Sequence, residues 1–258
     1  MDSLFLEELK ARKQAALIES FKTVCDSYDV EQLSFIDGAN LMAEIAREIR
    51  TQSKYEKDIK AANLPCSRAH RRDVDFIHSR RLEREVFNYQ FQLHWLKDKA
   101  HVVITGPSQI GKNWLASALC VAAIEAGKKV RAYNVDQLLK DLAKSRSEIG
   151  RGGKNGFDSK IDELAKFDLI FLHGFCNDDE PDVTLLKDLT LLIRSWHKEK
   201  SLIVTSPVPS NSWRDYFEHS YLGDSIINRI IGRATVFDLD GEPYQEYSIN
   251  IPPNGQLS

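Results

Sequence analysis

The sequence predicts an α/β fold, with a three-layer αβα core on a five-stranded parallel sheet behind a small all-helical N-terminal domain. From His101 onward, short and nearly continuous apolar runs alternate with stretches of helical periodicity. This alternation is typical of parallel strands that helices cover on both faces. A glycine-containing loop also joins the first of these runs to a long alanine-rich helix.

Residues 1–66 are expected to form the helical domain. Leu41, Ile45 and Ile49 recur at helical spacing, and helix breakers are scarce before Pro65. A turn between two helices is expected within residues 29–37.

Residues 67–98 are expected to be a linker and a helix that lead into the core. The stretch 66–75 is polar and basic, which favours a connector. The following segment, 80–97, has a helical pattern that ends in an apolar and aromatic run.

The core is expected to span residues 99–250, and residues 251–258 are expected to be a flexible tail. Its predicted strands are the apolar runs 101–105, 129–133, 168–172, 201–206 and 234–240. Its predicted helices are 112–126, 135–147, 183–198 and 223–231.

Composition and charge are those of an ordinary globular chain. Hydrophobic residues make up 42% and charged residues 28%, with a net charge of −3, so any nucleic-acid site must be a local basic patch. The 4 cysteines form no CxxC pair, so neither a zinc site nor a disulfide framework is predicted. No signal peptide is recognisable, and no apolar run approaches the roughly 20 residues that cross a bilayer. We therefore expect a cytoplasmic protein without membrane association.

The most informative motif is the loop Gly106-Pro-Ser-Gln-Ile-Gly-Lys-Asn113, which matches GxxxxGK[ST] except at its last residue. In such a loop the backbone N–H groups and the helix N-terminus bind phosphate, and the lysine reaches the outer phosphates. We predict that ATP or ADP binds here. The predicted cofactor-binding residues are Gly106, Pro107, Ser108, Gln109, Ile110, Gly111, Lys112, Asn113 and Trp114.

Magnesium binding is expected to be weak at this loop. Asn113 stands where Ser or Thr ordinarily binds Mg²⁺, and its amide oxygen is the candidate metal ligand. A carboxylate at the end of a neighbouring strand is also needed, but His173 and Gly174 follow the strand 168–172. His173 is a candidate general base, although a structural histidine fits the sequence as well. The acidic cluster within 178–182 either folds back toward the metal or forms a solvated loop.

The order of these features resembles the IstB-like branch of the AAA+ initiator and helicase-loader proteins. The resemblance rests on the blocks LSFIDGANLMAEIAREIR, GPSQIGKNWLASALC, SLIVTSPVPSNSWRDYF and DSIINRIIGRATVFDLDGEPYQE. It implies an AAA+ core and an ATP-dependent oligomer that acts on DNA and recruits a transposase. It also implies that Arg229 is the candidate arginine finger.

The departures from the family pattern all remove catalytic groups. Besides Asn113, His173 and Gly174, the changed positions are Pro207, Asn228 and Gln245. Charged groups at such sites stabilise the transition state, so we expect ATP hydrolysis to be weak or lost.

DNA is expected to contact the arginines between the helical domain and the core, because guanidinium groups fit phosphate oxygens. These candidates are Arg68, Arg71, Arg72, Arg80, Arg81 and Arg84. Such a cluster is equally typical of a solvated surface. Three readings of the function stay open at this point: a transposition helper, a non-hydrolysing regulatory paralogue, and a helicase loader or replication accessory protein.

Overall fold

The computed structural model describes residues 4–28, 32–76, 80–146, 155–177, 183–196, 199–218 and 220–243. The chain divides into two compact units, Met1–Asp58 and Ile59–Ser258. The long helix α3 (Phe35–Ala62) runs across this division.

The N-terminal unit is helical. Helices α1 (Leu4–Ala11) and α2 (Ala15–Ser27) contact each other, with the rings of Phe5 and Phe21 5.5 Å apart. Ser34 determines where α3 begins, because its Oγ accepts a hydrogen bond from the Asp37 N–H at 3.2 Å and donates one to the Asp37 carboxylate. A turn was expected within residues 29–37. Residues 29–31 lie outside the described residues, and residues 32–34 precede α3.

The expected single helix over 80–97 is wrong. The segment instead contains α4 (Arg84–Gln90) and α5 (His94–Lys97), preceded by a 3₁₀ turn at Arg71–Asp73. Leu93 has a φ of 58°, which lies in the left-handed region and breaks the helix. The indole of Trp95 then donates a hydrogen bond of 2.9 Å to the carbonyl oxygen of Gln90, which fixes the bend.

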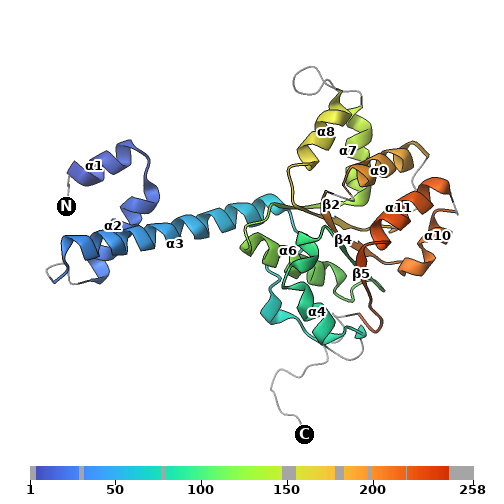
Figure 1. Cartoon of the computed structure of the whole chain (residues 1–258), viewed down its shortest axis with the longest axis horizontal. Coiled ribbons are helices and arrows are strands. Elements are labelled where there is room, and N and C mark those ends of the chain that lie inside the picture. Colours follow the sequence, from blue (N-terminus) through green and yellow to red (C-terminus); the bar gives the residue numbers. More distant parts are fainter. Residues whose placement is uncertain are drawn as a thin grey trace, which may run out of the picture. The chain divides into compact units, whose positions relative to one another are not determined.

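The second unit contains a parallel sheet with the strand order β2-β3-β4-β1-β5 (Figure 1). All neighbouring strands are parallel, and β1 lies between β4 and β5. The strands are β1 (His101–Thr105), β2 (Val130–Asn134), β3 (Leu169–His173), β4 (Ser201–Ser206) and β5 (Ala234–Asp238). The five predicted apolar runs are therefore confirmed as strands, with ends that shift by one or two residues.

Helices cover both faces of this sheet. Helix α6 packs against β1 to β4 on one face, and α7, α9 and α11 pack together on the other (Figure 1). Short helices α8 and α10 were not predicted. The helices of the core are α6 (Lys112–Glu125), α7 (Val135–Ser145), α8 (Gly156–Leu164), α9 (Val183–Trp196), α10 (Trp213–Tyr216) and α11 (Tyr221–Ile231).

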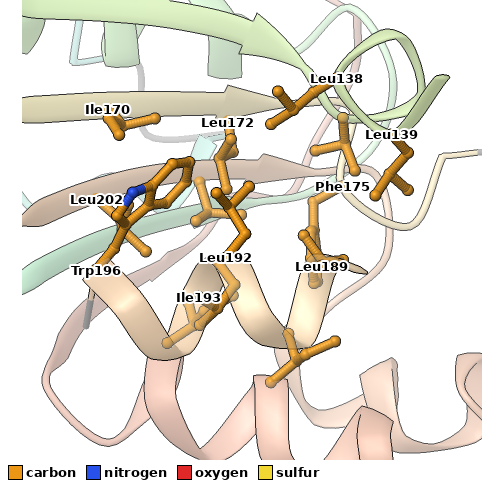
Figure 2. Close-up of a cluster of buried hydrophobic side chains, with 14 of the residues drawn as sticks. Leu138, Leu139, Ile170, Leu172, Phe175, Leu189, Leu192, Ile193, Trp196 and Leu202 are labelled. Carbon is orange, nitrogen blue, oxygen red and sulfur yellow. The ribbon is translucent and has the colours of Figure 1, made fainter. Parts of the chain in front are cut away.

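The apolar core between the sheet and α7, α9 and α11 contains Trp196 and Trp213, the largest fully buried side chains of the described residues. Figure 2 shows Trp196, Leu192 and Leu189 of α9 pointing toward the strand residues Leu172 and Leu202. Each of these five side chains is at most 3% exposed. Burying each such side chain contributes about 2 kcal/mol. This layer therefore stabilises the sheet whose strand ends carry the candidate site.

An ion pair with a buried carboxylate joins the end of α7 to α9. Arg146, just after α7, donates to both carboxylate oxygens of Asp188, with 3.1 Å between Nε and Oδ2. Asp188 is fully buried, whereas 43% of the Arg146 side chain is exposed. None of the helices that the structure describes is both long and apolar enough to cross a membrane.

Candidate functional site

The predicted phosphate loop lies between the carboxyl end of β1 and the start of α6. Gly106 has a φ of +139°, and a Cβ there would lie 2.4 Å from the carbonyl oxygen of Leu239. Gly111 has a φ of +95°, which L residues rarely adopt. Glycine is therefore required at both ends of the loop, by the backbone conformation and, at Gly106, by the approach of the segment after β5.

Lys112 points back over the loop. Its Nζ donates hydrogen bonds to the carbonyl oxygens of Gly106 at 2.7 Å and Pro107 at 2.6 Å. Burial lowers the pKa of Lys112 to about 8, because desolvation penalises the charged form. A phosphate bound at the loop would stabilise the charged form of this amino group and raise its pKa.

A cleft of about 520 Å³ opens beside the loop. The loop and α6 form one wall, and the linker before β1 forms the other. The cleft is lined by Cys66, Asp73, Asp75, Arg80, Gln109, Gly111, Lys112, Asn113 and Trp114. Gln109, Gly111, Lys112, Asn113 and Trp114 were predicted from sequence, and the volume is of the order that small-molecule sites occupy.

The remaining predicted loop residues lie nearby but do not line the cleft. Ile110 is fully buried, whereas Pro107 and Ser108 are exposed. Gly106 is buried under the segment after β5, and Gly106 and Pro107 act through the carbonyl oxygens that hold Lys112.

Arg80 is separated from the other arginines of the predicted DNA-binding cluster. Its side chain is only 4% exposed, and its guanidinium donates to the carbonyl oxygens of Ile110, at 3.3 Å, and Asp75. Its own carbonyl oxygen accepts a hydrogen bond of 3.3 Å from Asp240. Arg80 thus joins the linker, the phosphate loop and the end of β5, and it belongs to the wall of the cleft rather than to an exposed surface.

The amide of Asn113 is held by the neighbouring strand β4. Its Oδ1 accepts a hydrogen bond from the hydroxyl of Thr205 at 2.7 Å, and Thr205 is 1% exposed. The oxygen that was the candidate metal ligand is therefore engaged by the protein.

The end of β3 holds His173 and Gly174, as the sequence indicated. Burial lowers the pKa of His173, so the imidazole is neutral near pH 7. Its ring lies 5.6 Å from that of Phe171, and His173 is not among the residues that line the cleft. Within the described part of the chain, no group of three or more His, Cys, Asp or Glu residues is arranged to hold a metal ion. The loop and the end of β3 therefore supply no carboxylate for magnesium, and the carboxylates of the cleft are Asp73 and Asp75 on its linker wall.

Arg229 lies in the last turn of α11 and contacts its own helix. Its Nη1 donates to the backbone oxygen of Ser225 at 2.6 Å and to the Ser225 hydroxyl. Arg229 does not line the cleft of its own chain.

The other predicted DNA-binding arginines are exposed but do not form one surface patch around a single hollow. Arg71 and Arg72 border a hollow against α6, and Arg81 and Arg84 border another beside Phe76. Arg81 forms an ion pair of 2.9 Å with Asp240, and Arg84 lies 4.7 Å above the ring of Phe76. Arg68 is exposed.

Sequence reasoning missed Thr205 and the linker residues of the cleft, Cys66, Asp73 and Asp75. Thr205 had a usable signal, since ligands of open α/β sheets gather at the carboxyl ends of the strands. The linker residues had none, because an irregular segment has no periodicity from which its inward face can be read. The acidic cluster at 178–182, Gln245 and the predicted tail lie outside the described residues.

Solved structures of replication proteins resemble this chain in fold. A crystal structure of DnaI matches with a TM-score of 0.51 at 15% identity, covering 71% of this chain and 93% of that one. The AMPPCP-bound DnaA of Aquifex aeolicus matches with a TM-score of 0.54 at 15% identity, covering 72% of this chain and 53% of that one. The five-stranded parallel sheet and its covering helices are therefore an AAA+ fold.

Relatives at the sequence level come from insertion sequences. A Bacillus thuringiensis subsp. berliner protein, named for insertion sequence IS232 and for ATP binding, is 24% identical over 93% of this chain and 92% of its own length. A Pseudomonas aeruginosa protein, named for insertion sequence IS21 and for ATP binding, is 27% identical over 76% of this chain and 71% of its own length. The model of the IstB-like ATP binding proteins matches residues 7–248, and the chain belongs to this family.

Proposed function

We propose that this protein is an ATP-binding helper of DNA transposition that assembles on DNA and engages a transposase, with ATP hydrolysis weak or lost. The single observation that carries the proposal is the phosphate loop. Both glycines are held at positive φ, and Lys112 folds over the loop beside an open cleft. The family and the insertion-sequence relatives supply the context of transposition.

The loss of hydrolysis is supported by the end of β3. In an ATPase a carboxylate there would organise the metal and the attacking water. His173 is neutral, Gly174 has no side chain, and Asn113 is bonded to Thr205. ATP binding, rather than ATP hydrolysis, would then favour assembly.

In such an assembly, Arg229 would serve as the arginine finger toward the nucleotide of a neighbouring copy. Arg229 is half-buried in the last turn of α11 and donates to Ser225 of the same helix. Arg68, Arg71, Arg72, Arg81 and Arg84 would contact DNA phosphates. The helical N-terminal domain of such a helper would be residues 1–66.

The test is ATP-dependent assembly on duplex DNA, measured by sedimentation together with steady-state ATP hydrolysis. We expect ATP to promote assembly of the wild-type protein without turnover above background, and Lys112→Ala to abolish the effect. Assembly that is indifferent to ATP and to Lys112 would refute the helper function. Rapid DNA-stimulated hydrolysis would refute only the loss of turnover.

The arginine contacts have their own test. Arg72→Glu should weaken DNA binding. It should also lower the slope of the logarithm of the binding constant against the logarithm of the salt concentration by about one unit, because binding with one phosphate contact fewer releases fewer counterions. Lys10→Glu, which reverses a charge on exposed α1, provides the comparison.

A further inference from the structure

The phosphate loop of this protein lacks the groups that place a divalent cation beside a nucleotide. Mg²⁺ takes oxygen ligands in octahedral geometry, commonly one or two carboxylates together with substrate phosphates and water. Among the described residues no group of three or more His, Cys, Asp or Glu is arranged to hold a metal ion, and the end of β3 carries His173 and Gly174. The two carboxylates that line the cleft, Asp73 and Asp75, lie on its linker wall, and Asp73 pairs with Arg72 at 3.8 Å.

Asn113 replaces the hydroxyl ligand with a group of the opposite character. Its oxygen already accepts the hydrogen bond from Thr205, which is itself buried. The NH₂ end of the same amide donates two hydrogen bonds and accepts none. Such a group suits a phosphate oxygen and repels a cation.

A second positive charge lies against the loop where the site would otherwise rely on a metal. The guanidinium of Arg80 lines the cleft together with Lys112. Its Nη1 would lie only 2.9 Å from a Cβ at Gly111 and is 3.3 Å from the carbonyl oxygen of Ile110. Arginine is always charged and presents several donors in a fixed plane, which fits phosphate oxygens.

We propose that this site binds nucleoside di- or triphosphates as metal-free anions. Lys112, Arg80 and the NH₂ group of Asn113 supply the positive charge and the hydrogen-bond donors that magnesium supplies elsewhere. The inference rests on the nucleotide site of the proposed function and adds to it the form of the ligand. The end of β3 carries no acidic pair, and carboxylates there would repel a free polyphosphate.

The coupling between metal and nucleotide should accordingly be absent. A site that uses Mg²⁺ binds ATP more tightly when the metal is present, and the two ligands strengthen each other by the same factor. A site that uses only the free anion gains nothing from the metal. Added Mg²⁺ then weakens the apparent affinity, because it removes free nucleotide from solution.

The decisive experiment is calorimetric titration of the full chain with ATP and with ADP, once in excess Mg²⁺ and once in EDTA. We expect the Kd in EDTA to equal or lie below the Kd in Mg²⁺. A Kd that rises about tenfold or more in EDTA, a loss of about 1.4 kcal/mol, would overturn the inference while leaving the nucleotide site intact. Wild-type protein that binds neither nucleotide in either solution would instead refute the site and the proposed function with it.

Two variants assign the effect to the named residues. Asn113→Thr exchanges the donor for a hydroxyl, so we expect the Kd in EDTA to rise while the Kd in Mg²⁺ stays the same or falls. Arg80→Lys keeps the charge and should retain metal-free binding better than Arg80→Met, with Lys128→Ala as an exposed control outside the cleft. Equal effects of Asn113→Thr and Arg80→Met in the two solutions would mean that these residues only support the fold of the loop.

Discussion

The Nζ atom of Lys112 lies 2.7 Å from the carbonyl oxygen of Gly106, so the lysine of the phosphate loop is bound by its own loop. The carbonyl oxygen of Pro107 provides the second acceptor, at 2.6 Å. A phosphate that enters the loop must offer better acceptors than these two neutral oxygens. Its negative charge does so, because it adds a Coulombic attraction to the ammonium that a neutral carbonyl oxygen lacks.

Nucleotide affinity should fall as the pH rises above the pKa of Lys112, which burial lowers to about 8. The amino group is charged below that pH and neutral above it, and a bound phosphate raises its pKa. Affinity is therefore full on the acidic side and is lost between the pKa values of the free and bound forms. Titrations at about pH 7 and about pH 9.5 measure this, and Lys112→Arg should flatten the dependence because arginine stays charged. A Kd of wild type that is constant over this range would contradict a role of Lys112 in binding.

Gly106→Ala should destabilise the protein by about 2 kcal/mol or more and abolish nucleotide binding, because its Cβ would collide with the backbone of Leu239. Gly127→Ala is the matched control, with a φ of +76° and no atom within 4 Å of an added Cβ. That variant should cost only the left-handed strain, about 1 kcal/mol, and keep binding. Urea unfolding and nucleotide titration measure the two properties. Equal losses in both variants would show that the approach of Leu239 is unimportant.

Arg146→Met should lower the free energy of unfolding by about 3 kcal/mol, because it leaves the carboxylate of Asp188 buried without its partner. Replacing both residues, Arg146→Met with Asp188→Leu, should recover much of that loss. Chemical denaturation of the two variants and of Asp188→Leu alone completes a double-mutant cycle. Additive effects would show that the two side chains do not interact energetically.

Trp213→Ala should cost about 4 kcal/mol of stability, since the side chain is fully buried and its ring lies 4.6 Å from that of Phe175. Trp213→Phe retains an aromatic ring but removes the indole N–H, which donates to Val208 O at 3.0 Å and Ser206 Oγ at 3.2 Å. The phenylalanine variant should therefore lose about 1 to 2 kcal/mol. Thermal unfolding separates the two, and a phenylalanine variant as weak as the alanine variant would assign the stability to the hydrogen bonds.

The sheet could be predicted from sequence because its strands are buried on both faces. In such strands consecutive residues on both faces are apolar, as in the run Leu202-Ile-Val204 of β4, and β4, Ser201–Ser206, matched its predicted range. The helix over 80–97 could not be predicted correctly. Its apolar residues fit a helical period, but the left-handed turn at Leu93 is held by a local side-chain-to-backbone hydrogen bond, from Trp95 to Gln90, which hydrophobic periodicity does not report.

The residues on the loop side of the cleft could be predicted from the spacing of the GxxxxGK motif. The residues on the linker side could not be predicted in this way. Arg80 and Arg81 are adjacent in sequence and chemically identical, yet one is 4% exposed and the other forms an exposed ion pair with Asp240. Only the path of the chain across the phosphate loop distinguishes them. Local sequence therefore identifies the motif, and tertiary structure identifies its partners.

The conformation of Gly174 bears on the proposed loss of hydrolysis. Its φ of +75° disfavours an L side chain, and a Cβ there would lie 3.1 Å from the side-chain nitrogen of Asn134. An aspartate or glutamate at this position would therefore have to take a backbone conformation that L residues rarely adopt. An acid that served hydrolysis at position 174 would require the backbone at the end of β3 to change as well as the side chain, so replacing the residue alone would lower stability before any catalytic benefit appeared.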